Sequence, residues 1–411
     1  MEDFGQLDKI FSEIINQSIE AKTLNVNEFI RQMEAGFKSC GFREPPANGI
    51  LKNILIIRLD AVGDYILTSA AIRTIRENFP SAHITFVVSE NLYPLAELCP
   101  YVNEVFAIDQ DQNFSPQLLV DLANFARQNL WRRHFDLSFY LGLVMRPVRN
   151  FLSYLSGARE RICFDVDEAS KYFHTKCIQI LPEYYEHECL MNLHLLRQAG
   201  LKIGDTRLEI WFERADLIAA ERLMGNFAPN RIKISVGIGA NHAARKYPVE
   251  KYLIAFSEII SKGASIIILG GPAEVDDAKF LEDNLPAEFV KNVVPIKTGW
   301  RIDAALMSLT DLYIGNMTGA CDVAAALKLP IVTLSRVAKD ITEFFKIHNE
   351  AKSYRPWQTK SIVLQPDHQL DDCRAQPSYL GCRANTAHCI AQITPQEIVD
   401  AYEKMLEFIR R

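Results

Sequence analysis

The sequence predicts an α/β protein with two doubly wound parallel sheets and a helical extension at its N-terminus. Short, continuous apolar runs alternate with helical stretches, as expected of strands that crossover helices bury on both faces. This alternation occurs twice, over two stretches of similar length, and 411 residues leave room for two to three domains. Apolar residues make up 48% and charged residues 23% of the chain, which is typical of a globular protein and excludes global disorder.

The N-terminal half is expected to contain an extension and one domain. Residues 1–48 show apolar positions at helical spacing, which predicts amphipathic helices that form an added cap. The domain is expected over 49–226, with a helix that ends before Pro80 and a less regular part over 165–225 containing one helix near 188–198. Its predicted strands are the apolar runs 54–57, 84–88, 105–108 and 137–140.

The same alternation restarts after the polar stretch 226–231, which predicts a second domain over 227–390. Its expected strands are 232–238, 265–269, 290–294, 312–315 and 331–334. Helices are expected near 248–262, 273–284, 301–309 and 319–327. The chain after Leu334 is expected to be loop-like to about Cys389, before an amphipathic helix within 391–411.

Charge and composition exclude several classes of function. The chain has 45 Lys and Arg against 51 Asp and Glu, a net charge of −6, so no basic field predicts nucleic-acid binding. No apolar run approaches the roughly 18 to 20 residues that a transmembrane helix needs, and the acidic start lacks the basic region of a signal peptide. Because six of the nine cysteines are scattered without motif spacing, we expect reduced thiols and a cytoplasmic protein.

The segment Ile56–Asp64 is the strongest local motif. A buried strand ends there in a turn at Gly63 that begins a helix. Ligands of open α/β sheets bind beyond the carboxyl ends of the strands, so Asp64 is expected at the edge of a crevice. The alternative is a helix N-cap, which also favours aspartate. Arg58 and Asp60 are interpreted as a local ion pair.

Three further strand-to-helix junctions carry candidate ligand-binding residues. After the first strand of the second half, Gly239 allows close approach of a phosphate, and Arg245 with Lys246 supplies positive charge; the alternative is a solvated basic turn. Glu274 is a hydrogen-bond acceptor for a ribose or a base, or alternatively a partner of the helix dipole. The helix that begins at Gly319 offers its backbone amides to an anion.

Other signatures are incomplete. The Gly237-x-Gly239 pair does not extend to a dinucleotide fingerprint because position 242 is His, and no P-loop, zinc-protease motif or nucleophile elbow is present. Cys373, Cys382 and Cys389 offer three soft ligands, but their spacing fits no common zinc knuckle. We therefore favour buried thiols over a metal and expect no metal in the site.

Together these junctions resemble glycosyltransferase family 9, the ADP-heptose:lipopolysaccharide heptosyltransferases. The resemblance covers roughly residues 52–335 and is most specific in its opening signature, Arg58–Asp64 with Ala71–Arg76 and Phe79–Ile84. Later and individually weaker matches are Phe135–Leu137, Ser156–Arg159, Arg245–Pro248, Leu269–Gly271, Thr318–Gly319 and Ala324–Leu327.

The resemblance implies two facing Rossmann-like domains of the GT-B type and an inverting, metal-independent transfer that requires no cofactor. By this likeness Asp64 would be the general base on the acceptor hydroxyl, and Lys246 would neutralise the leaving diphosphate. Glu274 would contact the nucleoside, and Thr318 with Gly319 would hold the phosphates. With Gly63, Gly239 and Arg245, these residues form the expected donor-binding and catalytic set. Displacement of a nucleotide diphosphate needs such a base and such positive charge.

The implied reaction moves heptose from ADP-heptose, the co-substrate, to a cell-surface glycan such as the lipopolysaccharide core, or to a protein hydroxyl. Met317 and Asp322 stand where the family usually has an acidic residue and a histidine. This difference keeps open a donor with another nucleotide, such as UDP or GDP, and a catalytically silent binding or scaffold protein.

An anionic glycolipid acceptor would bring the protein into peripheral contact with the inner membrane surface. Four arginines suit such an acceptor, although we favour solvated helix and loop faces for them: Arg146, Arg149, Arg159 and Arg161. The acceptor and the oligomeric state stay undetermined, because acceptor loops vary freely on a fixed scaffold.

Overall fold

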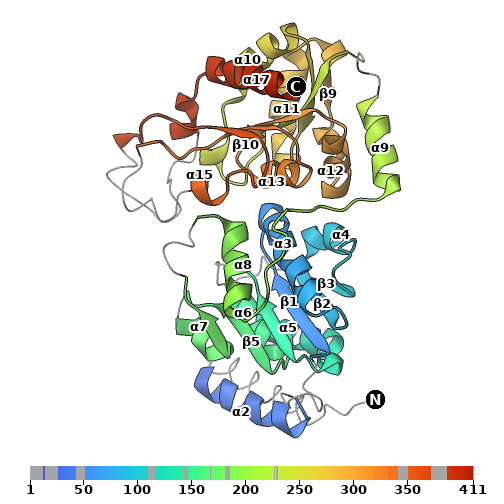
Figure 1. Ribbon diagram of the computed structural model, residues 1–411, viewed down its shortest axis with the longest axis vertical. Helices are drawn as coiled ribbons and strands as arrows, with labels where there is room; N and C mark the ends of the chain where they lie inside the picture. The colour runs from blue at the N-terminus through green and yellow to red at the C-terminus, as the bar shows by residue number, and fades with distance from the viewer. Residues whose placement is uncertain are drawn as a thin grey trace. The chain divides into compact units, whose positions relative to one another are not determined.

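The chain forms two compact units in a computed structural model (Figure 1). The first unit comprises Met1–Ala61, Ala70–Tyr184 and Cys189–Thr206, and the second comprises Val62–Ser69, Tyr185–Glu188 and Arg207–Arg411. The predicted domain boundaries at 48, 226 and 390 stay predictions. The residues that the structure describes are 13, 26–42, 51–109, 116–142, 147–166, 168–180, 186–225, 227, 230–340, 350–371 and 387–410.

A six-stranded parallel sheet forms the centre of the first unit. Its strands lie in the order β3-β2-β1-β4-β5-β6, so the order reverses between β1 and β4. The apolar run in β1 is buried on both faces because helices cover the sheet on either side. The strands are β1 Asn53–Arg58, β2 His83–Ser89, β3 Glu104–Ile108, β4 Leu137–Tyr140, β5 Glu160–Phe164 and β6 Lys176–Ile178. The helices are α3 Val62–Asn78, α4 Tyr93–Ala96, α5 Pro116–Asn129, α6 Pro147–Leu155, α7 Glu168–Phe173 and α8 Glu188–Gln198.

The N-terminal extension contributes an aromatic residue to this core. Helix α2 (Val26–Ser39) places Phe37 edge-on to Phe42, Trp131 and Tyr154, with ring centroids 5.3, 6.2 and 6.0 Å away. Such edge-to-face contacts stabilise a core beyond the burial of their area. Helix α2 is therefore packed into the core of the first unit, while the apolar positions Leu7, Ile10, Phe11, Ile14 and Ile15, which contribute to the helical spacing expected of the extension, lie outside the described residues.

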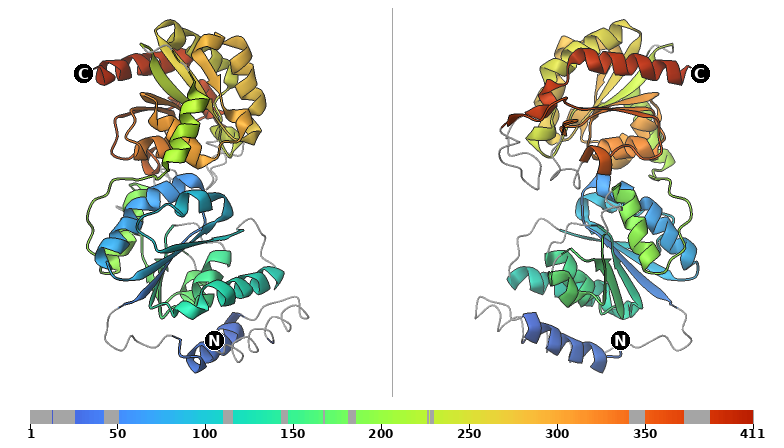
Figure 2. Two further views of the ribbon diagram at one scale, coloured as in Figure 1. Left: turned by 90° about the vertical axis from the view of Figure 1, so that its right-hand side faces the viewer. Right: turned by 60° about the vertical axis from the view of Figure 1, so that its left-hand side comes forward.

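The second unit repeats the architecture with a second parallel sheet in the order β12-β11-β10-β7-β8-β9. Its order reverses between β7 and β10, as between β1 and β4 in the first sheet. The C-terminal helix α17 packs beside α10 on this sheet's core (Figure 2). The strands are β7 Ile232–Gly237, β8 Ala264–Leu269, β9 Val290–Asn292, β10 Leu312–Asn316, β11 Ile331–Leu334 and β12 Ser361–Leu364. The helices are α9 Arg214–Met224, α10 Val249–Ser261, α11 Val275–Asn284, α12 Trp300–Ser308, α13 Gly319–Ala326, α15 Glu350–Ser353 and α17 Pro395–Ile409.

Most of the predicted strands are confirmed, and two predictions are wrong. The stretch after Leu334, expected to be loop-like, contains α15 and the parallel edge strand β12, and the stretch 165–225, for which one helix is predicted, contains α7, β6 and α9 as well. Strand β12 lies at the edge of the second sheet and is half-buried. Helix α9 forms an ion pair with a distant part of the chain, because Arg301 pairs with Asp216 at 2.8 Å.

Candidate functional site

The candidate site lies in the second unit, where its sheet reverses strand order between β7 and β10. In doubly wound sheets the ligand crevice opens at this point, beyond the carboxyl ends of the strands. Strand β7 ends at Gly237 and β10 at Asn316, so the loops that follow them meet here. These loops carry Gly239, Arg245, Lys246, Thr318 and Gly319, the residues that the sequence predicted for donor binding.

A buried amide, Asn316, connects the two loops. Its Nδ2 donates to the carbonyl oxygens of Ile238 at 2.8 Å and Gly239 at 3.2 Å. Its Oδ1 accepts from the Tyr252 hydroxyl at 2.9 Å and from the Tyr247 amide at 3.2 Å. With all of these bonds in a fully buried position, Asn316 determines the path of the loop between β7 and α10. Sequence reasoning did not select this residue.

Helix α13 begins at the end of β10 with the predicted phosphate-binding pair. Thr318 is its N-cap in extended conformation, without a side-chain capping hydrogen bond, and Gly319 is its first helical residue. The first amides of a helix have no partners within the helix and form an anion site. Asp322 in the same turn is buried, with 5% of its surface exposed.

Helix α3 brings Gly63 and Asp64 to the same place, since Val62–Ser69 belongs to the second unit. A Cβ atom on Gly63 would lie 3.1 Å from the Cα of Gly319, and one on Gly319 would lie 2.9 Å from the Gly63 amide nitrogen. Both positions therefore require glycine. The residue that caps α3 is Ala61, and Asp64 is the third residue of the helix, so the N-cap alternative for Asp64 is wrong. Asp64 is half-buried, in a first turn whose dipole favours a carboxylate.

Lys246 and Glu274, assigned to different parts of the donor by the sequence, are paired with each other. The Lys246 Nζ lies 2.7 Å from Asp277 Oδ2 and 3.5 Å from Glu274 Oε1. Burial lowers the pKa of Lys246, but the hydrogen bonds and charges of Asp277 and Glu274 outweigh it, so the pKa is raised and the ammonium stays charged. Glu274 is itself buried and accepts the Gly271 amide at 2.9 Å. Sequence reasoning missed Asp277, whose only local signal is its place in the first turn of α11.

The remaining candidates from the sequence are distributed as follows. Arg58 and Asp60 form the expected ion pair at 3.1 Å. Arg161 is not on a solvated face, because it is buried and donates to the carbonyl oxygens of Ala158 and Phe173, each at 2.7 Å. Arg159 pairs with Glu160 at 3.1 Å. Lying outside what the structure describes are Arg146, the side chain of Arg149, Cys373 and Cys382.

The described residues contain neither a cluster of metal ligands nor a membrane-spanning helix. No group of three or more His, Cys, Asp and Glu side chains in the described part of the chain is arranged to hold a metal ion. Among the helices of that part, none has both the length and the apolar character for a membrane crossing.

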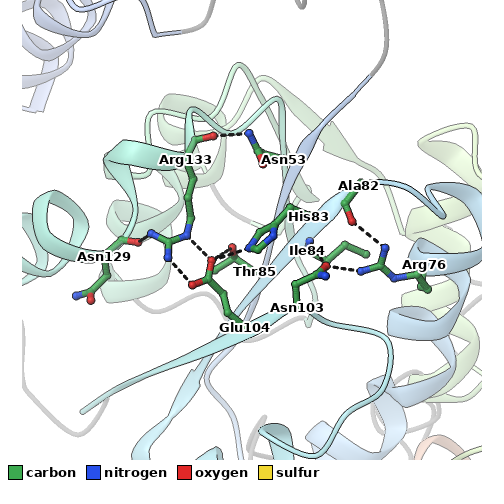
Figure 3. Close-up of polar contacts among 10 residues, drawn as sticks. All are labelled: Asn53, Arg76, Ala82, His83, Ile84, Thr85, Asn103, Glu104, Asn129 and Arg133. Atoms are coloured by element: carbon green, nitrogen blue, oxygen red, sulfur yellow. Dashed lines mark hydrogen bonds and ion pairs between the residues drawn. The ribbon is translucent and has the colours of Figure 1, made fainter. Parts of the chain in front are cut away.

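A separate pocket of about 650 Å³ lies at the opposite edge of the first sheet, where its strands begin (Figure 3). Its centre is the carboxylate of Glu104, which accepts hydrogen bonds from His83 at 2.8 Å, from Thr85 at 3.1 Å and from the Arg133 guanidinium. Burial raises the pKa of Glu104, but Arg133 and His83 outweigh it and the pKa is lowered. Within this network the Arg133 guanidinium balances the charge of the Glu104 carboxylate, and the hydrogen bonds join β2, β3 and the turn after α5.

The segment Tyr185–Glu188 is attached to the second unit through a buried histidine. The Nε2 of His187 is 2.8 Å from the Arg355 carbonyl oxygen, and its ring lies 4.5 Å from that of Trp357, centroid to centroid. Arg355 in turn donates to the Glu186 carbonyl at 3.0 Å. Burial lowers the pKa of His187 to about 4, so the ring is neutral at pH 7.

This histidine predicts a pH dependence of stability. Between about pH 6.5 and 4 the unfolded chain binds a proton at His187 that the folded chain does not, so the free energy of unfolding falls as pH falls. The loss reaches about 3 kcal/mol at pH 4. Urea unfolding of wild type and His187→Gln from pH 7 to pH 4 checks it, and the variant should lose less. His368→Gln, at a side chain 77% exposed, is the control, and equal slopes for all three proteins would contradict the assignment.

The fold and site together define the class. Two doubly wound parallel sheets, with an acidic residue and two helix N-termini at the carboxyl ends of their strands, are the architecture of GT-B glycosyltransferases. The chain belongs to glycosyltransferase family 9 (heptosyltransferase), whose family profile matches residues 148–371, more than half of its length. The protein is accordingly a glycosyltransferase.

Known proteins agree with this assignment. The chain is 19% identical over 347 residues to lipopolysaccharide heptosyltransferase 3 of Escherichia coli, covering 84% of this chain and 96% of that protein. Its fold matches a family 9 glycosyltransferase of Veillonella parvula with a TM-score of 0.71 and 20% identity, over 87% of this chain and 98% of the other. It also matches the E. coli ADP-heptose lipopolysaccharide heptosyltransferase II with a TM-score of 0.67 and 16% identity, over 87% and 100%.

Proposed function

We propose that the protein transfers heptose from ADP-heptose to a lipopolysaccharide core, with inversion at the anomeric carbon and with Asp64 as the general base. The observation that carries the proposal is the meeting of Gly63, next to Asp64, with Gly319 at the N-terminus of α13. This meeting brings a carboxylate and an anion-binding helix terminus to one place. Such a pair meets the two needs of the reaction, removal of a proton from the acceptor and stabilisation of a leaving diphosphate.

The acceptor half of the reaction uses Asp64. Asp64 is half-buried in the first turn of α3, where the helix dipole favours a carboxylate. An ionised carboxylate within hydrogen-bonding reach of the acceptor hydroxyl takes its proton as the oxygen attacks the anomeric carbon. Attack from the face opposite the leaving diphosphate inverts the configuration.

The leaving-group half uses the amides of Thr318 and Gly319 together with Lys246 and Arg245. Lys246 is charged and contacts Asp277 and Glu274, and its ammonium group has three N–H donors, so it can also contact a phosphate oxygen. Glu274, fixed by the Gly271 amide, keeps one oxygen beside the donor loop at Gly239. We assign Glu274 to the nucleoside and Gly239 to close approach of the phosphates.

The proposed donor and acceptor are supported by the names of relatives. The names of two of them specify lipopolysaccharide heptosyltransferases, and one of these names ADP-heptose. None of the seven cysteines that the structure describes forms a disulfide, which agrees with a reducing compartment, and we place the reaction in the cytoplasm. Met317 and Asp322, beside the phosphate-binding pair, favour a UDP- or GDP-linked sugar as the second candidate donor.

Thermal unfolding with ADP, UDP or GDP tests the donor assignment. A ligand that binds only the folded chain stabilises it by mass action, so ADP should raise Tm most. Lys246→Met should weaken ADP binding about 10- to 100-fold, because one charge-assisted contact is lost. Lys279→Met is the control, since this lysine is 66% exposed and pairs with Asp283 on the same helix. A larger shift with UDP or GDP would contradict the ADP assignment, and an unchanged Lys246→Met response would remove Lys246 from the site.

A further inference from the structure

A buried carboxyl group, Asp322, lies against the segment that carries the proposed base. It belongs to the first turn of α13, and its Oδ2 lies 2.6 Å from the position that a Cβ on Gly63 would occupy. Only 5% of Asp322 is exposed. Within the part of the chain that the structure describes, its Oδ1 has no hydrogen-bond partner. A buried, ionised carboxylate in such a position would be costly, since water hardly reaches it and no donor compensates the charge at Oδ1 among the described residues.

The surroundings of Asp322 contain negative rather than positive charge. Asp64 on α3 and Glu188 on α8 act on it electrostatically, and all three belong to the second unit. Tyr313 on β10 and Cys321 on α13 are the other titratable groups that it affects, and both are neutral because burial raises their pKa values. Burial first, and then the charges of Asp64 and Glu188, raises the pKa of Asp322 well above its ordinary value.

Two carboxyl groups that interact strongly lose their protons in two separate steps. The first proton leaves the group that is better solvated, and Asp64 is half-buried whereas Asp322 is buried. The second proton then stays until high pH, because its loss would place two charges together. This order assigns opposite states to the two residues at neutral pH.

We propose that Asp322 is a neutral carboxylic acid that positions Asp64, so that the two residues share a single negative charge and Asp64 is its ionised member. Asp322 is a positioning residue, because it acts through Asp64. Its neutral state also keeps a second negative charge away from the anion site at Gly319. The inference rests on the proposed function for its kinetic consequence but not for the proton on Asp322.

The proton on Asp322 is tested without any substrate. Above its ordinary pKa the folded chain retains a proton that the unfolded chain has lost, so stability decreases as pH rises. Asp322→Asn has no such proton to lose, so its stability should not show this decrease. The urea midpoint of the variant, relative to that of wild type, should therefore rise from pH 5 to pH 8. The control is Asp276→Asn, at an exposed acid in the first turn of α11. Its urea midpoint should differ from that of wild type by the same amount at every pH. A constant difference for Asp322→Asn would overturn the proposal.

Asp64→Asn supplies the reciprocal measurement and keeps the test decisive if Asp322→Asn does not fold. Removal of the neighbouring charge should weaken the loss of stability with rising pH, while an unchanged profile would refute a shared charge.

In the transfer assay, Asp322→Asn should keep activity within about tenfold and move the alkaline limb of kcat up by at least about one pH unit. Abolished transfer by the folded variant, or an unmoved limb, would overturn the positioning role. If wild type transfers no sugar, the proposed function fails, and the urea measurement still decides the proton.

Discussion

Replacement of Asp64 by asparagine should reduce kcat for sugar transfer by about 10²- to 10⁴-fold, the usual contribution of a general base. The amide keeps the size of the carboxyl group but cannot accept a proton from the acceptor hydroxyl. Because Asp64 is half-buried and does not cap α3, the substitution should leave the fold unchanged. Steady-state release of ADP from ADP-heptose, measured in the presence of acceptor, checks the prediction.

The matched control is Asp276→Asn, at an exposed acid that also lies in the first turn of a helix, α11. It should leave kcat unchanged. Affinity of Asp64→Asn for ADP should stay within a few fold of wild type, since the proposed base does not hold the diphosphate. Turnover by Asp64→Asn at the wild-type rate would show that another group removes the proton.

Replacement of Asn316 by leucine should reduce the free energy of unfolding by about 3 to 5 kcal/mol. The four hydrogen bonds of this buried amide contribute about 1 kcal/mol each, and their partners would be left without a replacement. Among these partners are the carbonyl oxygens of Ile238 and Gly239, so the donor loop should also lose its position. Urea unfolding measures the stability, and ADP titration measures the effect on the loop.

Asn284→Leu is the control for this substitution, because Asn284 is exposed and makes a local hydrogen bond to Phe280. Exposed substitutions of this kind change stability within about 0.5 kcal/mol. A loss below about 1 kcal/mol for Asn316→Leu would mean that the loop between β7 and α10 is held by other contacts.

The central strands and their crossover helices could be predicted because their chemistry is local. The runs in β1 and β8 are apolar throughout, since both faces are covered, and such runs are visible in any short window of sequence. The edge strand β12 has a short apolar run, Ile362–Leu364, but it stands in a stretch without the regular alternation of strands and helices that marks the other strands. Helix α9 is bound by Arg301, 85 residues away in the sequence, and a contact between such distant positions produces no local periodicity.

The candidate site shows the same limit. The junctions after β1, β7 and β10 predicted where Asp64, Lys246 and Gly319 would lie, because ligands bind at the carboxyl ends of strands. Asn316 is the last residue of β10, shortly before a helix, so locally it resembles a turn residue, and its partners lie 64 to 78 positions away. The pairing of Lys246 with Asp277 likewise joins separate elements, and the sequence indicated the positive charge without its counter-charge.

The most direct measurement is the reaction itself. Wild-type protein would be incubated with ADP-heptose and a lipopolysaccharide core acceptor, with ADP release followed together with acceptor mass and with the anomeric configuration by NMR. The expected result is one ADP released for each heptose added, and an inverted anomeric centre. Retention of configuration, or transfer only from a UDP- or GDP-linked sugar, would contradict it.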